Sequence, residues 1–144
     1  MGTSAAGVLH TGQSRASRVR LPARTVSVAV ARRRVRDVIT AWDVPEALAD
    51  AAVLVTSELV TNAIRAEPGA AVTLCLSVQA GRFRIAVHDS SPDAVSLRAT
   101  EEPTADGGRG LVLVDALASE WGSQRIPGGK EVYAVFDLRP EAEG

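Results

Sequence analysis

The sequence predicts an α+β domain whose strands pair in antiparallel fashion. Two segments with helical periodicity come first, and two pairs of alternating segments, each joined by a short turn containing glycine, follow in the second half. Consecutive hairpins of this kind argue against a regular strand, helix, strand alternation and its parallel sheet. With 144 residues, 46% of them hydrophobic, the chain is long enough for one domain with one core.

Two helices are expected after residue 20. Apolar residues recur every three or four positions between Val28 and Trp42, which is the period of one helix face. Asp43-Val44-Pro45 ends this segment, and Pro45 suits the first turn of a second helix. We expect that helix from about Glu46 to Arg65, with an apolar stripe at Leu48, Ala52, Val55 and Leu59.

The rest of the chain alternates between strand and turn patterns. Residues 72–78 and 82–89 have the period of a strand with one buried face, and the residues between them have turn chemistry. Residues 90–110 read as a loop of about twenty residues, a length that is usually functional or disordered. A short helix at 111–119 and strands at 121–126 and 132–138 complete the order.

Charge is distributed unevenly along the chain. Residues 1–36 contain eight arginines and no acidic residue, whereas residues 37–144 carry eight basic and seventeen acidic residues. Residues 1–20 have no sustained period, so we expect a flexible arginine-containing tail there and a folded domain at 21–140. Because residues 1–36 hold no aromatic side chain to stack bases, direct binding of nucleic acid is not expected. The arginines between residues 32 and 36 suit a solvated helix face or one that meets an acidic partner.

Several classes of protein are disfavoured by composition. The single cysteine, Cys75, excludes an intramolecular disulfide and any CxxC motif, and the two histidines, His10 and His88, make a histidine-rich zinc site improbable. We find no signal-peptide pattern and no apolar run near the roughly 20 residues of a membrane span. We therefore expect a soluble, cytoplasmic protein that does not enter a membrane.

Polar side chains interrupt the apolar second helix. Glu58 and Asn62 are four residues apart and project from the same helix face, and Arg65 follows one turn later. This set is either a solvated stripe or a ligand site. An amide oxygen and a carboxylate on one face suit Mg²⁺, which takes one or two protein oxygens and completes its shell with water and phosphate.

Two further segments have the chemistry of a binding site. Asp89 closes a strand, where it is either an ordinary turn residue or an acceptor for a ligand's amino group. The run from Asp106 to Leu111 places three glycines around one arginine before a helix, so backbone N–H groups can turn toward a phosphate. A flexible loop before a helix is the alternative, since the run matches neither common phosphate-loop pattern.

Taken in order, these features resemble a known superfamily. Glu58 with Asn62, then Asp89, then residues 107–111 and then residues 129–132 resemble the nucleotide-binding boxes of the ATPase superfamily that unites gyrases, heat-shock chaperones, histidine kinases and mismatch-repair proteins, the GHKL superfamily. Within it, the chain looks most similar to actinobacterial ATP-binding proteins related to anti-sigma serine kinases. The resemblance covers about residues 22–138.

The resemblance implies a Bergerat-type two-layer α/β sandwich, with a mixed, mostly antiparallel sheet backed by about three helices. It implies ATP and Mg²⁺ as cofactors, with Glu58 as general base, Asn62 as the metal ligand and Asp89 on the adenine amino group. Gly129 and Val132 would support the adenine pocket, and the glycines and Arg109 would approach the phosphates. The implied nucleotide-binding set is Asn62, Arg65, Asp89, Gly107, Gly108, Arg109, Gly110, Leu111, Gly129 and Val132.

The implied activity is that of a serine/threonine protein kinase that phosphorylates an anti-sigma antagonist. The alternative is a catalytically weak or inactive ATP-binding regulator that sequesters a sigma factor or another partner, and a homodimer is expected in either case. The chain departs from the pattern after Asp89, where Ser90-Ser91-Pro92 replaces a glycine-containing continuation, and at Ala66, where relatives often carry histidine. It also lacks the dimerisation helix pair of a sensor histidine kinase.

Overall fold

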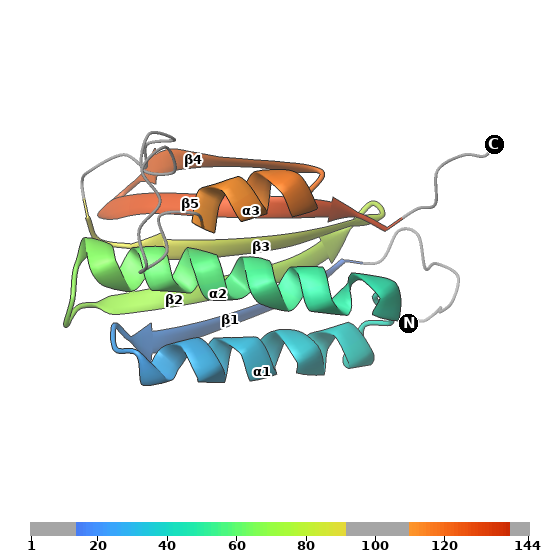
Figure 1. Ribbon diagram of the computed structural model, residues 1–144, viewed down its shortest axis with the longest axis horizontal. Coiled ribbons are helices and arrows are strands. Elements are labelled where there is room, and N and C mark those ends of the chain that lie inside the picture. Colours follow the sequence, from blue (N-terminus) through green and yellow to red (C-terminus); the bar gives the residue numbers. More distant parts are fainter. Residues whose placement is uncertain (1–13, 92–109, 139–144) are drawn as a thin grey trace.

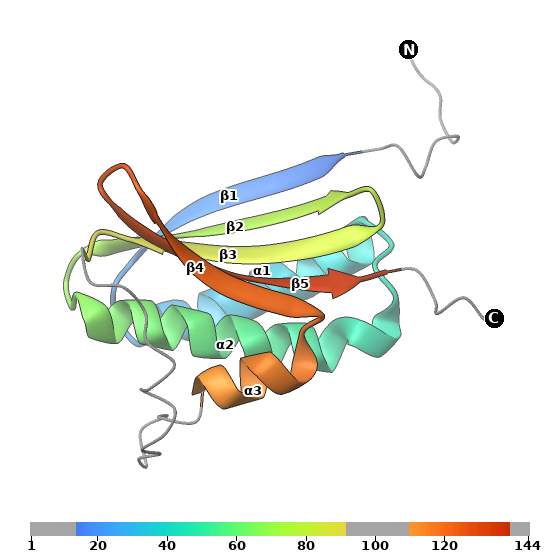
Figure 2. The same cartoon turned by 90° about the horizontal axis from the view of Figure 1, so that it is seen from above.

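A computed structural model of the chain describes residues 14–91 and 110–138. Within these ranges the three helices cover one face of a five-stranded sheet and leave the other face bare (Figures 1 and 2). The elements are β1 (Arg15–Pro22), α1 (Val26–Ala41), the single-turn 3-10 helix η2 (Glu46–Leu48), α2 (Ala49–Ala66), β2 (Ala71–Gln79), β3 (Arg82–Asp89), α3 (Gly110–Leu117), β4 (Glu120–Ile126) and β5 (Gly129–Asp137).

The α+β class and the sandwich are confirmed, with one correction to the sheet. The strand order is β1-β2-β3-β5-β4, and every pair of neighbours among the described strands is antiparallel. The expected mixed character is therefore wrong for this part of the chain. The reason is that both hairpins are antiparallel by construction, and the connection through α3 and β4 returns β5 against β3 in the opposite direction.

Alternation along the strands separates the two faces of the sheet. On β3, Phe83, Ile85 and Val87 point toward the helices and are fully buried. They lie opposite Phe136, Ala134 and Val132 of β5, which are buried as well, so the same face of both strands builds the core. The residues between them face the side without helices.

Helix α2 is the centre of the helical layer and packs against α1, α3 and the sheet. The expected stripe is buried at Ala52, Val55 and Leu59. The stretch Glu46–Ala66 is long and apolar enough to cross a membrane by length and composition. Its packing against α1, α3 and the sheet is that of a core helix.

The turns use the residues that the backbone demands. Ala80 and Gly81 between β2 and β3 have φ angles of 54° and 77°, as the two central residues of a type I′ hairpin turn require. Gly128, after Pro127, has a φ of 85° in the turn between β4 and β5, which fits proline followed by glycine at the centre of a type II turn.

The flexible tail predicted for residues 1–20 is wrong for residues 15–20, which belong to β1. This strand pairs along its whole length with β2. Its alternation explains why: Val19 and Leu21 pack toward the core, whereas Arg18 and Arg20 are exposed on the opposite face. Pairing also satisfies backbone groups at the open edge of β2. Residues 1–13 and most of the predicted loop, residues 92–109, lie outside the described ranges.

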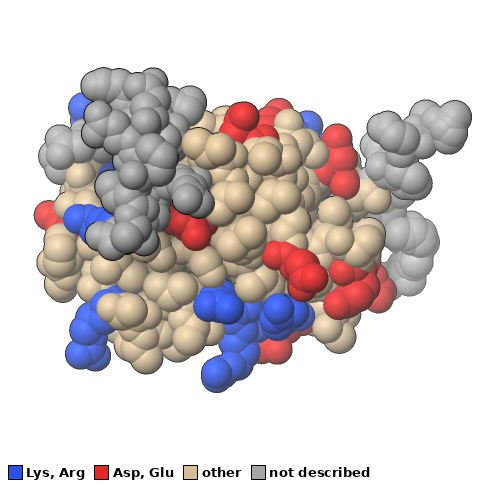
Figure 3. Space-filling view, viewed as in Figure 1, with Lys and Arg blue, Asp and Glu red and all other residues tan. Residues whose placement is uncertain are grey.

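The arginines of α1 lie on its outer surface. Figure 3 shows basic side chains gathered along the edge of the molecule that this helix forms. Arg32, Arg33, Arg34 and Arg36 are all exposed, and Arg36 approaches the exposed Asp50 of α2 at 3.9 Å. An exposed pair of this length contributes little to stability. The surface is therefore a solvated basic face on the first helix.

Candidate functional site

Asp89 lies at the end of β3 with its side chain 2% exposed. Oδ1 accepts two hydrogen bonds, one of 3.0 Å from Nζ of Lys130 and one of 2.8 Å from the backbone N–H of Ser91. Oδ2 is buried and has no hydrogen-bond partner within the described residues. A buried carboxylate oxygen without a partner carries an unrecovered desolvation cost, so this atom is suited to accept an N–H group from a ligand.

The close approach of β5 to this end of β3 depends on Gly129. Asp89 lies opposite Lys130 in the register, directly beside Gly129. A Cβ atom on Gly129 would collide with the carbonyl oxygen of Asp89 and lie 2.8 Å from its carbonyl carbon. Glycine is therefore required for the two strands to meet here. Val132 is buried farther along β5, opposite Val87, and belongs to the core.

The polar residues of α2 lie on one face of that helix, as their spacing predicts. Glu58 and Asn62 are half-buried and Arg65 is exposed. Neither the Glu58 carboxylate nor the Asn62 amide makes a side-chain hydrogen bond within the described part of the chain. Burial raises the pKa of Glu58 above its ordinary value, and the positive charge of Arg65 partly offsets that increase.

The last turns of α2 and the end of β3 are neighbours. Ser90, directly after Asp89, donates a hydrogen bond of 2.8 Å from its hydroxyl to Oε1 of Glu67, directly after α2. Figure 2 shows the two ends lying together at the same end of the sandwich. The structure thus places the C-terminal end of α2, with Asn62 and Arg65 in its last turns, beside the end of β3, and Glu58 lies farther back at the middle of the helix.

The glycine-rich segment is only partly described. Gly107, Gly108 and Arg109 lie outside the described residues, so their predicted phosphate contacts stay predictions. Gly110 begins α3, and Leu111 is buried in its first turn. Because α3 packs against α2, the start of this helix belongs to the same helical layer as Glu58 and Asn62.

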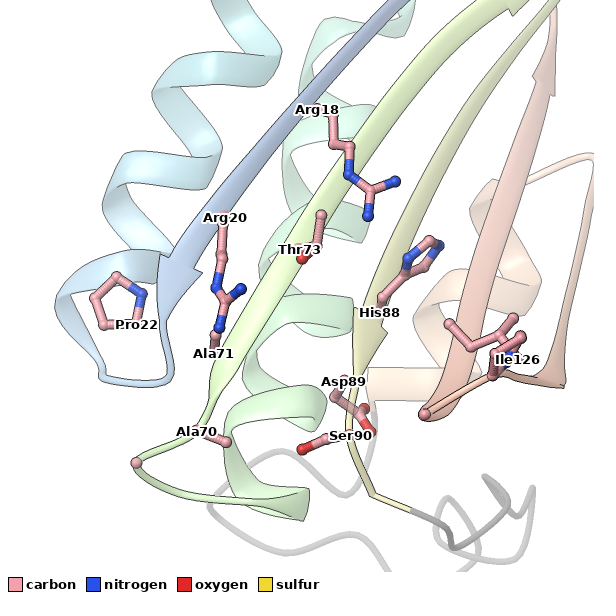
Figure 4. A pocket seen from close by; sticks show the side chains of 13 residues that line it. Arg18, Arg20, Pro22, Ala70, Ala71, Thr73, His88, Asp89, Ser90 and Ile126 are labelled. Atoms are coloured by element: carbon pink, nitrogen blue, oxygen red, sulfur yellow. The ribbon is translucent and has the colours of Figure 1, made fainter.

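A separate hollow of about 700 Å³ lies on the face of the sheet without helices. Figure 4 views this face and shows the side chains of Arg18, Arg20, Thr73 and His88, which come from β1, β2 and β3. Asp89 borders the hollow at the strand end, but its side chain alternates toward the helical face. The sheet therefore separates this hollow from the α2 residues, and among the described residues of the predicted site only Asp89 borders it.

The bare face of the sheet also holds an ionic network that sequence reasoning did not predict. Glu131 accepts hydrogen bonds from Arg84 at 2.7 and 3.3 Å and from Gln124 at 2.7 Å, and it contacts Nε2 of His88 at 2.8 Å. Burial alone would raise the pKa of Glu131, but these partners lower it to about 2. The network ties β3, β4 and β5 together.

Lys130 is a residue of the candidate site that the sequence did not reveal. It is the chain's only lysine, and although residues 129–132 resemble a nucleotide-binding box, the sequence assigned a role there to Gly129 and Val132 and none to Lys130. One signal was available: alternation along 130–136 places Lys130 on the same face as Val132, Ala134 and Phe136, which is the buried face. A lysine on such a face requires an anionic partner, and Asp89 is that partner.

These observations define a two-layer α/β sandwich with polar residues of a central helix and a ligand-ready carboxylate at one end. The family model of the histidine kinase-like ATPase domain matches residues 21–136. The chain therefore belongs to the histidine kinase-like ATPase family, and the predicted relationship is confirmed.

A solved structure has the same fold. The crystal structure of the RsbU and RsbW domains of Rv1364c from Mycobacterium tuberculosis aligns with a TM-score of 0.66 at 19% sequence identity. The alignment covers 88% of this chain and 33% of that protein chain, so the present chain matches about a third of its length. A comparison with curated proteins gave no significant match.

Proposed function

We propose that this protein is an ATP- and Mg²⁺-dependent serine/threonine protein kinase of the anti-sigma type, which phosphorylates a serine of an anti-sigma antagonist. The family indicates an ATP-binding domain in a regulatory role. The observation that carries the proposal is the unpartnered Oδ2 of Asp89 beside the C-terminal end of α2, the helix that carries Glu58 and Asn62. The fold shared with a protein that contains an RsbW domain supports the same direction.

Asp89 and Gly129 fit the adenine end of ATP. Oδ2 of Asp89 is an acceptor, and the exocyclic amino group of adenine is a donor, so the base satisfies a buried oxygen that no described residue satisfies. Gly129 lets β5 approach the Asp89 backbone and so sets where this carboxylate lies. In the proposal, Val132 supports the pocket from the core.

Glu58 and Asn62 fit the phosphate end. When bound, Mg²⁺-ATP supplies the γ-phosphoryl group and neutralises part of its charge. The Asn62 amide oxygen is the proposed Mg²⁺ ligand, because it is a hard oxygen donor with no competing hydrogen bond among the described residues. Glu58 is the proposed general base, and its raised pKa brings it closer to the working pH of a base that accepts a hydroxyl proton.

The lid residues complete the proposed site. Gly107, Gly108 and Gly110 allow backbone N–H groups to face the phosphates, and Arg109 adds positive charge. Arg65, on the same helix face as Glu58 and Asn62, is proposed to interact with the nucleotide, and Leu111 anchors the start of α3 in the core. Phosphoryl transfer depends mainly on positioning and charge neutralisation, which these groups would provide.

One observation favours a second candidate, a catalytically weak ATP-binding regulator that sequesters a sigma factor. A general base is held in one orientation by a second group, yet no described residue hydrogen-bonds the Glu58 carboxylate. Nucleotide binding through Asp89 does not need that orientation. Both candidates would act as homodimers in the cytoplasm, on protein partners rather than on nucleic acid.

Phosphotransfer with labelled ATP separates the two candidates. The protein is incubated with γ-labelled ATP, Mg²⁺ and candidate antagonist proteins from the same genome, beside Glu58→Gln as the matched control. The kinase is supported by a labelled serine that appears with the unchanged protein and not with the variant. Equal ATP binding by both proteins without labelled antagonist would favour the regulator.

A further inference from the structure

Lys130 is an unusual residue for its position. Its side chain is 7% exposed, at the start of a strand whose other inward residues are apolar. Lysine is almost never fully buried unless it is paired, because removing an ammonium group from water is costly. The group that compensates this cost is Asp89, whose Oδ1 lies 3.0 Å from Nζ. Asp89 of β3 and Lys130 of β5 lie directly opposite each other in the antiparallel register.

The pair leaves the carboxylate with one occupied and one unoccupied oxygen. Lys130 and the Ser91 N–H both reach Oδ1, whereas Oδ2 has no partner within residues 14–91 and 110–138. Two donors on one oxygen fix the rotation of the carboxylate group. A carboxylate oxygen accepts hydrogen bonds and cannot donate them, so the remaining oxygen is an acceptor in a fixed direction.

We propose that Lys130 is a positioning residue that makes the site select bases carrying an amino donor. It holds the Asp89 carboxylate in one orientation, so that Oδ2 accepts from a 6-amino group and disfavours a 6-oxo group, which offers only an acceptor. This inference rests on the proposed nucleotide site and adds the residue that enforces its choice of base. Lys130 itself is not a catalytic residue, because it acts through Asp89.

Two other roles for Lys130 predict different outcomes. If Lys130 only stabilised the pairing of β3 with β5, its removal would weaken the binding of all nucleotides equally. If its ammonium group competed with the base for Asp89, its removal would strengthen ATP binding. Only the positioning role predicts that the affinity for ATP falls more than the affinity for an analogue with a 6-oxo group.

The test compares ATP and ITP, which differ in the 6-amino and 6-oxo groups, by calorimetric titration. Lys130→Met keeps a long unbranched side chain and removes its charge. We expect ATP affinity to fall about 10- to 150-fold, the equivalent of a hydrogen bond to a charged group, and ITP affinity to change little. Arg125→Met is the matched control, since it removes an exposed positive charge opposite Lys130 on β4 and should leave both affinities unchanged.

A second measurement tests the positioning itself without any nucleotide. The Ser91 amide donates to the same Oδ1, so freeing the carboxylate in Lys130→Met should speed hydrogen exchange of that amide, and Arg125→Met should not. Lys130→Gln, which keeps an N–H donor without charge, should give intermediate exchange if Lys130→Met folds poorly. Unchanged exchange, or equal loss of ATP and ITP, would overturn the inference. Failure of the unchanged protein to bind either nucleotide would instead refute the proposed function and the base selection together.

Discussion

Gly129→Ala is expected to damage the nucleotide site more than the fold. The added Cβ would collide with the backbone carbonyl of Asp89. Because this carbonyl belongs to a paired strand, it cannot move aside as a flexible side chain could. Forcing extra volume into a packed contact costs about 1–3 kcal/mol of unfolding free energy. The contact is relieved by displacing Asp89 or the start of β5, and either shift moves Oδ2 away from its ligand.

Gly128→Ala is the matched control. Gly128 has a φ of 85° but nothing within 4 Å of an added Cβ. Alanine at this position therefore costs about 1–2 kcal/mol of unfolding free energy through its backbone conformation alone, without any collision. The two variants should have similar urea midpoints, whereas only Gly129→Ala should lose ATP affinity. If the hydrogen bond to Oδ2 is lost, that loss is about 1.5–3 kcal/mol, or roughly 10- to 150-fold in Kd.

Urea unfolding and calorimetric ATP titration of both variants measure the two effects separately. Equal ATP affinities for Gly129→Ala, Gly128→Ala and the unchanged protein would show that the added Cβ on Gly129 does not move Oδ2 of Asp89, contrary to the expectation. A loss of affinity in both variants would show that the turn as a whole, rather than the contact with Asp89, controls binding.

Three further outcomes are expected. Glu58→Gln should abolish phosphotransfer and spare ATP binding, and loss of ATP binding in the variant would show that Glu58 is structural. In the unchanged protein the transfer rate should fall as the pH drops through the raised pKa of Glu58, because only the ionised carboxylate accepts a proton. Leu59→Ala, at a fully buried position of α2, should cost about 2–5 kcal/mol in urea unfolding, and a cost below 1 kcal/mol would contradict the packing. The pKa of Glu131 is lowered to about 2, so this carboxylate stabilises the folded state above the ordinary carboxyl range, and the stabilisation is lost as the pH falls toward 2. The difference in urea midpoint between Glu131→Gln and the unchanged protein should therefore shrink from pH 7 to pH 2. A difference independent of pH would show that the Glu131 network contributes nothing through its charge.

Helices and hairpins were predictable because their signals are local. The apolar spacing of α1 and α2 and the alternation of β2 and β3 place the predicted segments within a few residues of the observed ones. Strand β1 was missed because the arginine-rich composition of residues 1–20 favoured a tail over a short alternation. Arg18-Val19-Arg20-Leu21 has a strand period, but its stability comes from pairing with residues of β2 that lie 51 to 57 positions farther along the chain. Long-range pairing of this kind leaves only a weak local pattern.

The site was predictable to the extent that its residues share an element. Spacing alone placed Glu58, Asn62 and Arg65 on one helix face. The pairing of Asp89 with Lys130 could not be found in this way, because it depends on the register between β3 and β5 and on Gly129 permitting their approach. Alternation along β5 indicates that Lys130 lies on the buried face, but its partner becomes apparent only when that register is known.

Calorimetric titration of the folded protein with Mg²⁺-ATP, beside Asp89→Asn, tests the central claim that a nucleotide site lies at the Asp89 end of the sandwich. We expect saturable binding by the unchanged protein and an affinity lower by about tenfold or more in Asp89→Asn, which replaces a carboxylate oxygen with an amide group. Undiminished binding by that variant would remove Asp89 from the site. A folded protein that binds no ATP would contradict the account as a whole.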